Sequence, residues 1–149
     1  DVLGIEYAAT LKNIFALAGG SAKGLGYGDN FLSVLMSNST NEMNQFLNKI
    51  NPHKRNIKGS VYQGDLLVTA YSKHSRNRRF GELIGQGFSP KEVGQKMKMV
   101  AEGYFASHTI QLLKKDIKVK TPIIDGVHDI LYNKKSAQTT FTKLIKSLS

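Results

Sequence analysis

The stretch that decides the fold is "VLGIEYAATLKNIFALAGGSA", residues 2–22. Apolar side chains recur in it at every third or fourth position, and most of its residue types are good helix formers. This spacing places the apolar side chains on one face of a helix. The sequence therefore predicts a long buried helix, with a stripe formed by Ile5, Ala8, Ala9, Leu11, Ile14, Phe15 and Ala18.

Helical patterns continue after this stretch. The glycine-rich segment 19–30 predicts a turn, and Asp29 or Asn30 is expected to cap a second helix, with a break near "SNST" at 37–40. The segment 51–60 is polar, basic and rich in turn formers, which predicts a surface connection.

Three helix starts are visible in the second half of the chain. The segment "SPKE", 89–92, has an N-cap Ser, a Pro at the first helical position and a Glu three residues after the cap. The pair at 121–122 and Ser136 open two further helices. Another helix is expected at about 101–115, and its inward face is predicted to consist of Phe105, Thr109, Leu112 and Leu113.

Length and composition narrow the class of protein. A chain of 149 residues with almost no alternating strand pattern predicts one all-α domain over residues 1–149, a multi-helix bundle. Lys and Arg number 21 against 11 Asp and Glu, a net charge of +10 that favours anionic partners of any kind. The absence of cysteine and of a run long enough to span a bilayer leads us to expect a soluble protein in a reducing cytoplasm.

Motifs for a nucleotide or a metal are incomplete. In "GLGYGD", residues 24–29, the third glycine of a dinucleotide fingerprint would have to stand at 29, which is Asp, and the motif follows a helix rather than a strand. The histidines show no pair at helical ligand spacing, so no metal site is predicted. They are His53, His74, His108 and His128.

Lys12 is a candidate for proton transfer because it lies among apolar residues on the first helix. Partial desolvation disfavours the ammonium form and makes a lysine a usable proton donor and acceptor near neutral pH. The alternative is a lysine whose side chain reaches solvent at the edge of the stripe. Asn13 is a second polar group there; the neighbours of Lys12 one turn away are Ala8, Ala9, Phe15 and Ala16.

A basic cluster, "SKHSRNRRFG", occupies residues 72–81. Arg76 offers a planar fork for a phosphate, while Ser75 and Asn77 add hydroxyl and amide donors. Asp65, upstream in "QGDLLVT", is expected to be a semi-buried carboxylate. Three interpretations stay open on composition alone: a solvated loop, a site for a small anion, and a nucleic-acid surface, which would require more aromatic residues than this segment has.

Six motifs carry a resemblance over essentially the whole chain: "LKNIFALAGG", "GLGYGDN", "QGDLLVT", "SRNRRFGELIGQG", "MVAEG" and "TPIIDGVHDILY". Together they resemble the C-terminal substrate domain of bacterial NAD(P)-dependent glycerol-3-phosphate dehydrogenase. The resemblance implies an all-helical domain similar to the C-terminal domain of 6-phosphogluconate dehydrogenase. It also implies an N-terminal Rossmann domain that binds most of the NAD or NADP and is absent from this chain.

The resemblance also implies roles for individual residues. Lys12 would be the catalytic, proton-transferring lysine. The implied substrate-binding residues are Lys12, Asn13, Asp65, Thr69, Ser75, Arg76 and Asn77. The implied cofactor contacts are Arg76, Val100 and Glu102; the remaining charges Lys73, Arg78 and Arg79 are interpreted as peripheral.

The implied reaction is the reversible NAD(P)H-dependent reduction of dihydroxyacetone phosphate to sn-glycerol 3-phosphate, for glycerophospholipid synthesis. The fragment alone is expected to be inactive, a homodimer is possible, and no nucleic acid is expected to bind. The alternatives are a non-catalytic basic helical module that binds nucleic acid and a related hydroxy-acid dehydrogenase domain. The chain departs from its relatives at Asn38, Ser39 and Gln63, which leaves the local packing open.

Overall fold

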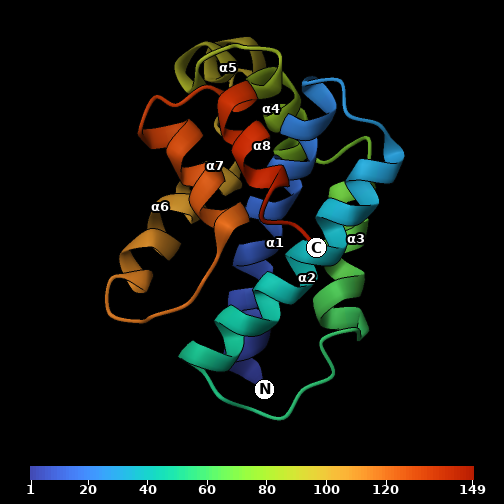
Figure 1. Ribbon diagram of the computed structural model, residues 1–149, viewed down its shortest axis with the longest axis vertical. Helices are drawn as coiled ribbons and strands as arrows, with labels where there is room; N and C mark the ends of the chain where they lie inside the picture. The colour runs from blue at the N-terminus through green and yellow to red at the C-terminus, as the bar shows by residue number, and fades with distance from the viewer.

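The computed structural model describes all residues 1–149 and contains eight α-helices, one short π-helical turn and no strand (Figure 1). The prediction of an all-α bundle is therefore confirmed. In chain order the elements are α1 (Val2–Gly24), α2 (Asp29–Ile50), the π-helical turn η1 (Ser60–Gly64), α3 (Asp65–Tyr71), α4 (Arg76–Gly85), α5 (Pro90–Met97), α6 (Glu102–Lys114), α7 (Pro122–Tyr132) and α8 (Ala137–Ile145).

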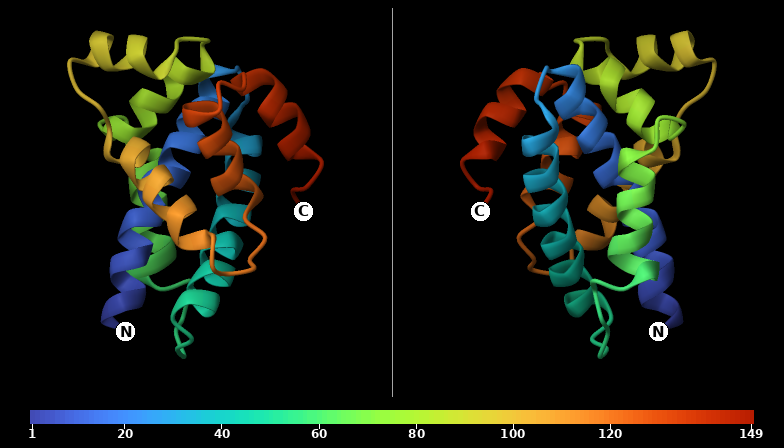
Figure 2. Two further views of the ribbon diagram at one scale, coloured as in Figure 1. Left: turned by 90° about the vertical axis from the view of Figure 1, so that its left-hand side faces the viewer. Right: turned by 90° about the vertical axis from the view of Figure 1, so that its right-hand side faces the viewer.

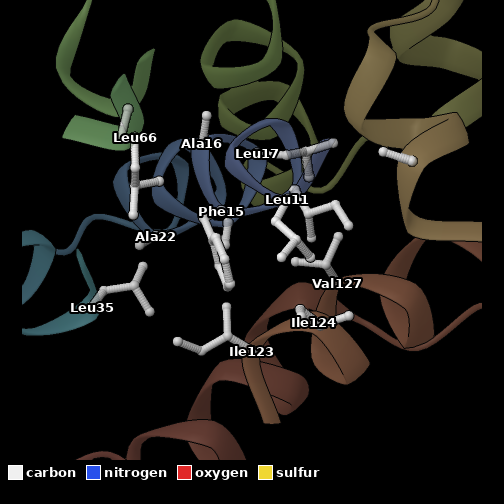
Figure 3. Packing of buried hydrophobic residues seen from close by; sticks show 14 of the residues in the cluster. Leu11, Phe15, Ala16, Leu17, Ala22, Leu35, Leu66, Ile123, Ile124 and Val127 are labelled. Carbon is white, nitrogen blue, oxygen red and sulfur yellow. The ribbon is translucent and has the colours of Figure 1, made fainter. Parts of the chain in front are cut away.

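The predicted long helix α1 is the centre of the molecule. It contacts α2, α3, α4, α6 and α7, and it runs between α6–α7 on one side and α2–α3 on the other (Figure 1). Leu11 and Phe15 are fully buried, and in the close view they lie among Ile123 and Val127 of α7 (Figure 3). Each such side chain stabilises the fold by roughly 1.5–3 kcal/mol, so α1 fixes the positions of its neighbours.

Glycines bring α4 into backbone contact with α1. A Cβ atom added to Gly81 of α4 would lie 2.1 Å from the carbonyl oxygen of Leu17, and one added to Gly20 of α1 would lie 2.0 Å from the carbonyl oxygen of Arg78. Larger residues at these positions would push the helices apart. The close contact sets the start of α4 at a fixed place beside α1.

The helix α2 differs from the prediction at two points. Its N-cap is Gly28, not Asp29 or Asn30, and it runs without a break through 37–40. The polar side chains that suggested a break bond back to the helix itself: Ser39 Oγ donates to the carbonyl of Leu35 at 2.8 Å, and Thr40 does the same to that of Met36 at 3.1 Å. These hydroxyls are satisfied without interrupting the backbone ladder.

Asn38 and Gln63, where we expected departures from the family pattern, bond to neighbouring parts of the chain in the same region. Asn38 Nδ2 donates to the carbonyl of Val34 at 2.9 Å, and its Oδ1 accepts from the backbone N–H of Ser149 at 3.2 Å. Gln63 Nε2 donates to Thr40 Oγ1 at 3.3 Å. Asn38 and Gln63 therefore join the C-terminus and η1 to α2.

The predicted inward face of α6 is wrong. Phe105 is 59% exposed and Leu112 48% exposed, Thr109 is exposed and Leu113 only partly buried. The side that packs on α1 carries small residues, because the two helices lie too close for large ones. A Cβ on Gly103 would already lie 2.7 Å from the carbonyl oxygen of Asn13. The buried residues of α6 are Gly103, Ala106, Ser107 and Ile110.

The three helix starts predicted in the second half of the chain at 89–92, 121–122 and Ser136 are confirmed. Ser89 and Glu92 form both hydrogen bonds of the capping box at α5, Thr121 precedes Pro122 at α7, and Ser136 Oγ accepts from the N–H of Thr139 at α8. No helix combines the length and apolar character needed to cross a bilayer.

The connection 51–60 lies on the surface at the same end of the molecule as the N-terminus (Figure 2). One of its side chains is an exception, because Arg55 is only 2% exposed and its Nε pairs with Asp1 Oδ2 at 2.7 Å. This ion pair joins the connection to Asp1, the N-cap residue of α1.

Candidate active site

The predicted site residues gather around one open pocket of about 490 Å³ between α1, the end of α3, the start of α4 and the segment before α6. The pocket also includes residues that were not predicted to belong to the site, namely Val68, Ser72, His74 and Met99. The predicted residues that line the pocket are Lys12, Asn13, Thr69, Ser75, Arg76, Asn77, Val100 and Glu102. A larger hollow of about 860 Å³ beside the C-terminal end of α6 contains none of the predicted residues.

Lys12 lies next to Asp65 although 53 positions separate them. Lys12 Nζ is 2.7 Å from Asp65 Oδ2, and the two side chains are 25% and 41% exposed. Lys12 is thus partly buried and held by a carboxylate, rather than extended into solvent. Asp65 is placed where η1 meets α3, and Thr69 Oγ1 donates to its carbonyl at 2.9 Å. A π-helical turn of this kind often accompanies a functional site.

A chain of hydrogen bonds links three of the residues that line the pocket. Asn77 Nδ2 donates to Asn13 Oδ1 at 3.1 Å, and Asn13 Nδ2 donates to Glu102 Oε2 at 3.2 Å. Asn77 Oδ1 accepts from the buried N–H of Gly103 at 2.7 Å. Since Asn77 is only 8% exposed and its side chain is engaged at both ends, it joins α1, α4 and α6.

The start of α4 presents donors without partners in the chain. Ser75 is the N-cap, and its Oγ accepts from the N–H of Arg78 at 3.2 Å. The backbone N–H groups of Arg76 and Asn77, in the first turn, have no acceptor. The exposed guanidinium of Arg76 also has no hydrogen bond or ion pair within the chain. Free N–H groups at a helix start, together with an arginine, form a favourable site for an anion.

The basic cluster therefore combines two of the interpretations left open: its first residues form a loop, and the helix start that follows is a candidate anion site. Residues from 76 onward form α4, which sequence reasoning did not predict. The signal was present, because Ser75 followed by a helix-compatible run is an N-cap pattern. The helix was not predicted because the run contains so many charged residues.

Outside the site, the structure brings together two histidines that appeared scattered in the sequence. The rings of His108 and His128 lie 6.4 Å apart between centroids, and both contact the ring of Tyr132. Burial lowers the pKa of His128, and the neighbouring His108 adds to this effect while Asp129 opposes it.

Comparison with known proteins identifies the class of domain. Residues 1–142 match the family described as NAD-dependent glycerol-3-phosphate dehydrogenase C-terminus. Glycerol-3-phosphate dehydrogenase [NAD(P)+] of Agathobacter rectalis is 39% identical over 145 residues, which cover 97% of this chain and 43% of that protein. The enzyme of the same name from Bacillus subtilis is 37% identical, with coverage of 97% and 42%.

A solved structure agrees with the sequence relatives. The crystal structure of glycerol-3-phosphate dehydrogenase from Coxiella burnetii superposes with a TM-score of 0.92 at 30% identity, covering 97% of this chain and 45% of that one. The chain belongs to the family of the C-terminal domain of NAD-dependent glycerol-3-phosphate dehydrogenases. It spans less than half the length of the relatives it matches.

Proposed function

We propose that this chain forms the substrate side of an NAD(P)-dependent glycerol-3-phosphate dehydrogenase. The reaction is the reversible reduction of dihydroxyacetone phosphate to sn-glycerol 3-phosphate, a step that serves glycerophospholipid synthesis in the cytoplasm. The observation that carries the proposal is that Lys12, paired with Asp65, lines the same pocket as the unpartnered donors of α4. This arrangement supplies a proton donor and a phosphate site within one small volume.

The substrate phosphate binds at the start of α4. Arg76 offers a charge-assisted, two-pronged contact, and the backbone N–H groups of Arg76 and Asn77, at the same helix start, are free to donate. Because the amide of Asn77 is engaged with Asn13 and Gly103, the contribution of Asn77 to the phosphate comes from its backbone. Ser75 lines the pocket beside these donors.

Lys12 transfers the proton. When the C2 carbonyl is reduced, the ammonium group of Lys12 donates a proton to the oxygen that gains negative charge, and in the reverse direction the amine accepts it. Asp65, 2.7 Å from Nζ, orients the group and balances its charge. Asn13 lies beside Lys12 in the pocket, fixed by Glu102 and Asn77.

The open side of the pocket fits a nicotinamide cofactor. Val68 is 69% exposed and Val100 41% exposed, so the rim offers apolar surface to an aromatic ring, with Glu102 as a polar neighbour. NAD(P)H supplies the hydride when it is bound. We expect a Rossmann domain elsewhere in the full-length protein to hold most of the cofactor and to cover this pocket.

The test is a substrate comparison with the full-length protein. Oxidation of NADH or NADPH is followed by absorbance with dihydroxyacetone phosphate and with dihydroxyacetone, which lacks only the phosphate. We expect turnover with the first and a kcat/KM lower by at least two orders of magnitude with the second, since charge-assisted phosphate contacts contribute several kcal/mol. Equal activity with both compounds, or with neither, would rule out the proposed function.

A further inference from the structure

Arg78 differs from the other charged residues of the basic cluster because its side chain bonds to other parts of the chain. Only 12% of that side chain is exposed, whereas the next residue, Arg79, is exposed and has no partner in the chain. Arg78 Nη1 donates to the backbone carbonyl of Tyr71 at 2.7 Å, and its Nε lies 3.4 Å from Glu82 Oε1. The interpretation of Arg78 as peripheral charge is therefore wrong.

The contact with Tyr71 joins the two ends of a connection that lines the active-site pocket. Tyr71 is the last residue of α3, where carbonyl groups lack partners in the helix. The connection between α3 and α4, residues 72–75, contributes Ser72, His74 and Ser75 to the pocket. Arg78 bridges that connection, because it bonds the end of α3 from the first turn of α4.

The backbone of Arg78 is itself fixed. Its carbonyl oxygen lies against Gly20 of α1, where a Cβ would approach to 2.0 Å. Glu82, its partner one turn along α4, also pairs with Lys23 of α1 at 3.6 Å. The guanidinium of Arg78 thus links the α1–α4 contact to the end of α3.

We propose that Arg78 is a positioning residue that holds the 72–75 connection in the shape that aligns Ser75 and the free N–H groups of α4 on the substrate phosphate. It does not touch the substrate. The proposal rests on the proposed function, because the phosphate site at α4 is part of it. A loosened connection costs substrate affinity while the Lys12–Asp65 pair, on α1 and at the start of α3, keeps its geometry.

The experiment compares Arg78→Gln, Arg78→Lys and the matched control Arg79→Gln in the full-length enzyme. For Arg78→Gln we expect the KM for dihydroxyacetone phosphate to rise about tenfold, with kcat within about twofold and the KM for the nicotinamide cofactor unchanged. Arg78→Lys keeps one donor but not the fork, so its KM should lie between those of wild type and Arg78→Gln. Arg79→Gln should behave as wild type.

Added guanidinium chloride, at millimolar concentrations well below those that unfold proteins, provides a second readout. It should lower the KM of Arg78→Gln toward the wild-type value and leave Arg79→Gln unchanged. If Arg78→Gln does not fold, Arg78→Lys with a wild-type KM overturns the proposal. A loss confined to kcat, or equal KM values for the two Gln variants, also overturns it. A wild-type enzyme without activity would instead refute the proposed function.

Discussion

The proton-transfer role of Lys12 depends on one ammonium group held by one carboxylate. Replacement by methionine keeps the length and the apolar contacts of the side chain but removes the proton. In the full-length enzyme, Lys12→Met should lower kcat by about 10²–10⁴-fold, the usual contribution of a general acid, while the KM changes only a few-fold. Steady-state kinetics measure both values. Lys143→Met on the exposed side of α8 is the control, and unimpaired turnover of Lys12→Met would contradict the role.

The unpartnered guanidinium of Arg76 leads to the opposite kinetic pattern. Its removal in Arg76→Ala takes away a charge-assisted contact worth roughly 1.5–3 kcal/mol, which corresponds to a 10- to 150-fold rise in the KM for dihydroxyacetone phosphate. The exposed Arg79, three positions further along the same helix, gives a matched control in Arg79→Ala. A similar KM for both variants would show that Arg76 does not bind the phosphate.

The roles and partners of individual residues could be predicted from the sequence only in part. The apolar surroundings of Lys12 marked it as unusual, but nothing local to the chain indicated that Asp65, 53 positions away, would lie 2.7 Å from it. The resemblance to a known family implied only that both residues belong to the same site. Arg78 and Arg79 are the same residue type side by side in the sequence, and only the position of the end of α3 distinguishes the partly buried, hydrogen-bonded Arg78 from the exposed Arg79.

At the level of elements, some helix starts were predictable from local patterns, whereas the inward face of a helix was not always so. A capping box at Ser89 is a local pattern, and local patterns persist in the fold. The inward face of α6 was predicted from its large apolar residues, but the face is chosen by the distance between helices. Close approach to α1 selects Gly103 and Ala106 and leaves Phe105 exposed.

The helices α1 and α4 also approach each other closely, and this contact leads to a prediction for stability. In Gly81→Ala the new Cβ would meet backbone atoms of Leu17 and Ser21 at 2.1 and 2.9 Å, which cannot move without displacing a helix. We expect the free energy of unfolding to fall by about 1–3 kcal/mol or more, as in other overpacked cores. Gly94→Ala in α5, where the nearest atoms lie at 3.6 Å or beyond, should be neutral or slightly stabilising. Urea unfolding of the two variants measures the difference, and equal stabilities would contradict the backbone contact.

At the scale of the whole molecule, α2 and α7 are joined by a buried carboxyl group that the proposed chemistry does not use. Glu42 is 4% exposed and accepts hydrogen bonds from the backbone N–H groups of Ile123 at 2.8 Å and Ile124 at 3.1 Å. Burial raises the pKa of Glu42 to about 8, although the two N–H groups oppose the rise. The carboxyl group therefore holds a proton in the folded protein over a range of pH in which an exposed glutamate has released it.

The pH dependence of stability follows from this difference. Between pH 4.5, the ordinary pKa of the group, and about pH 8, the folded state binds a proton that the unfolded state does not. The contribution of Glu42 to the free energy of unfolding is therefore complete below pH 4.5, falls as the pH rises, by at most about 1.4 kcal/mol per unit, and is lost above pH 8.

Urea unfolding of the wild type and of Glu42→Gln at several pH values between 5 and 8.5 isolates this contribution, because the amide cannot titrate. Glu42→Gln should be less stable at pH 5. Its NH₂ group cannot accept a hydrogen bond, so it faces a backbone N–H that donates to a carboxyl oxygen in the wild type. The gap should narrow as the pH rises, since only the wild type loses stability through the group. A gap that stays constant across this range would mean that Glu42 is ionised in the folded protein, held as a carboxylate by the two N–H groups at the start of α7.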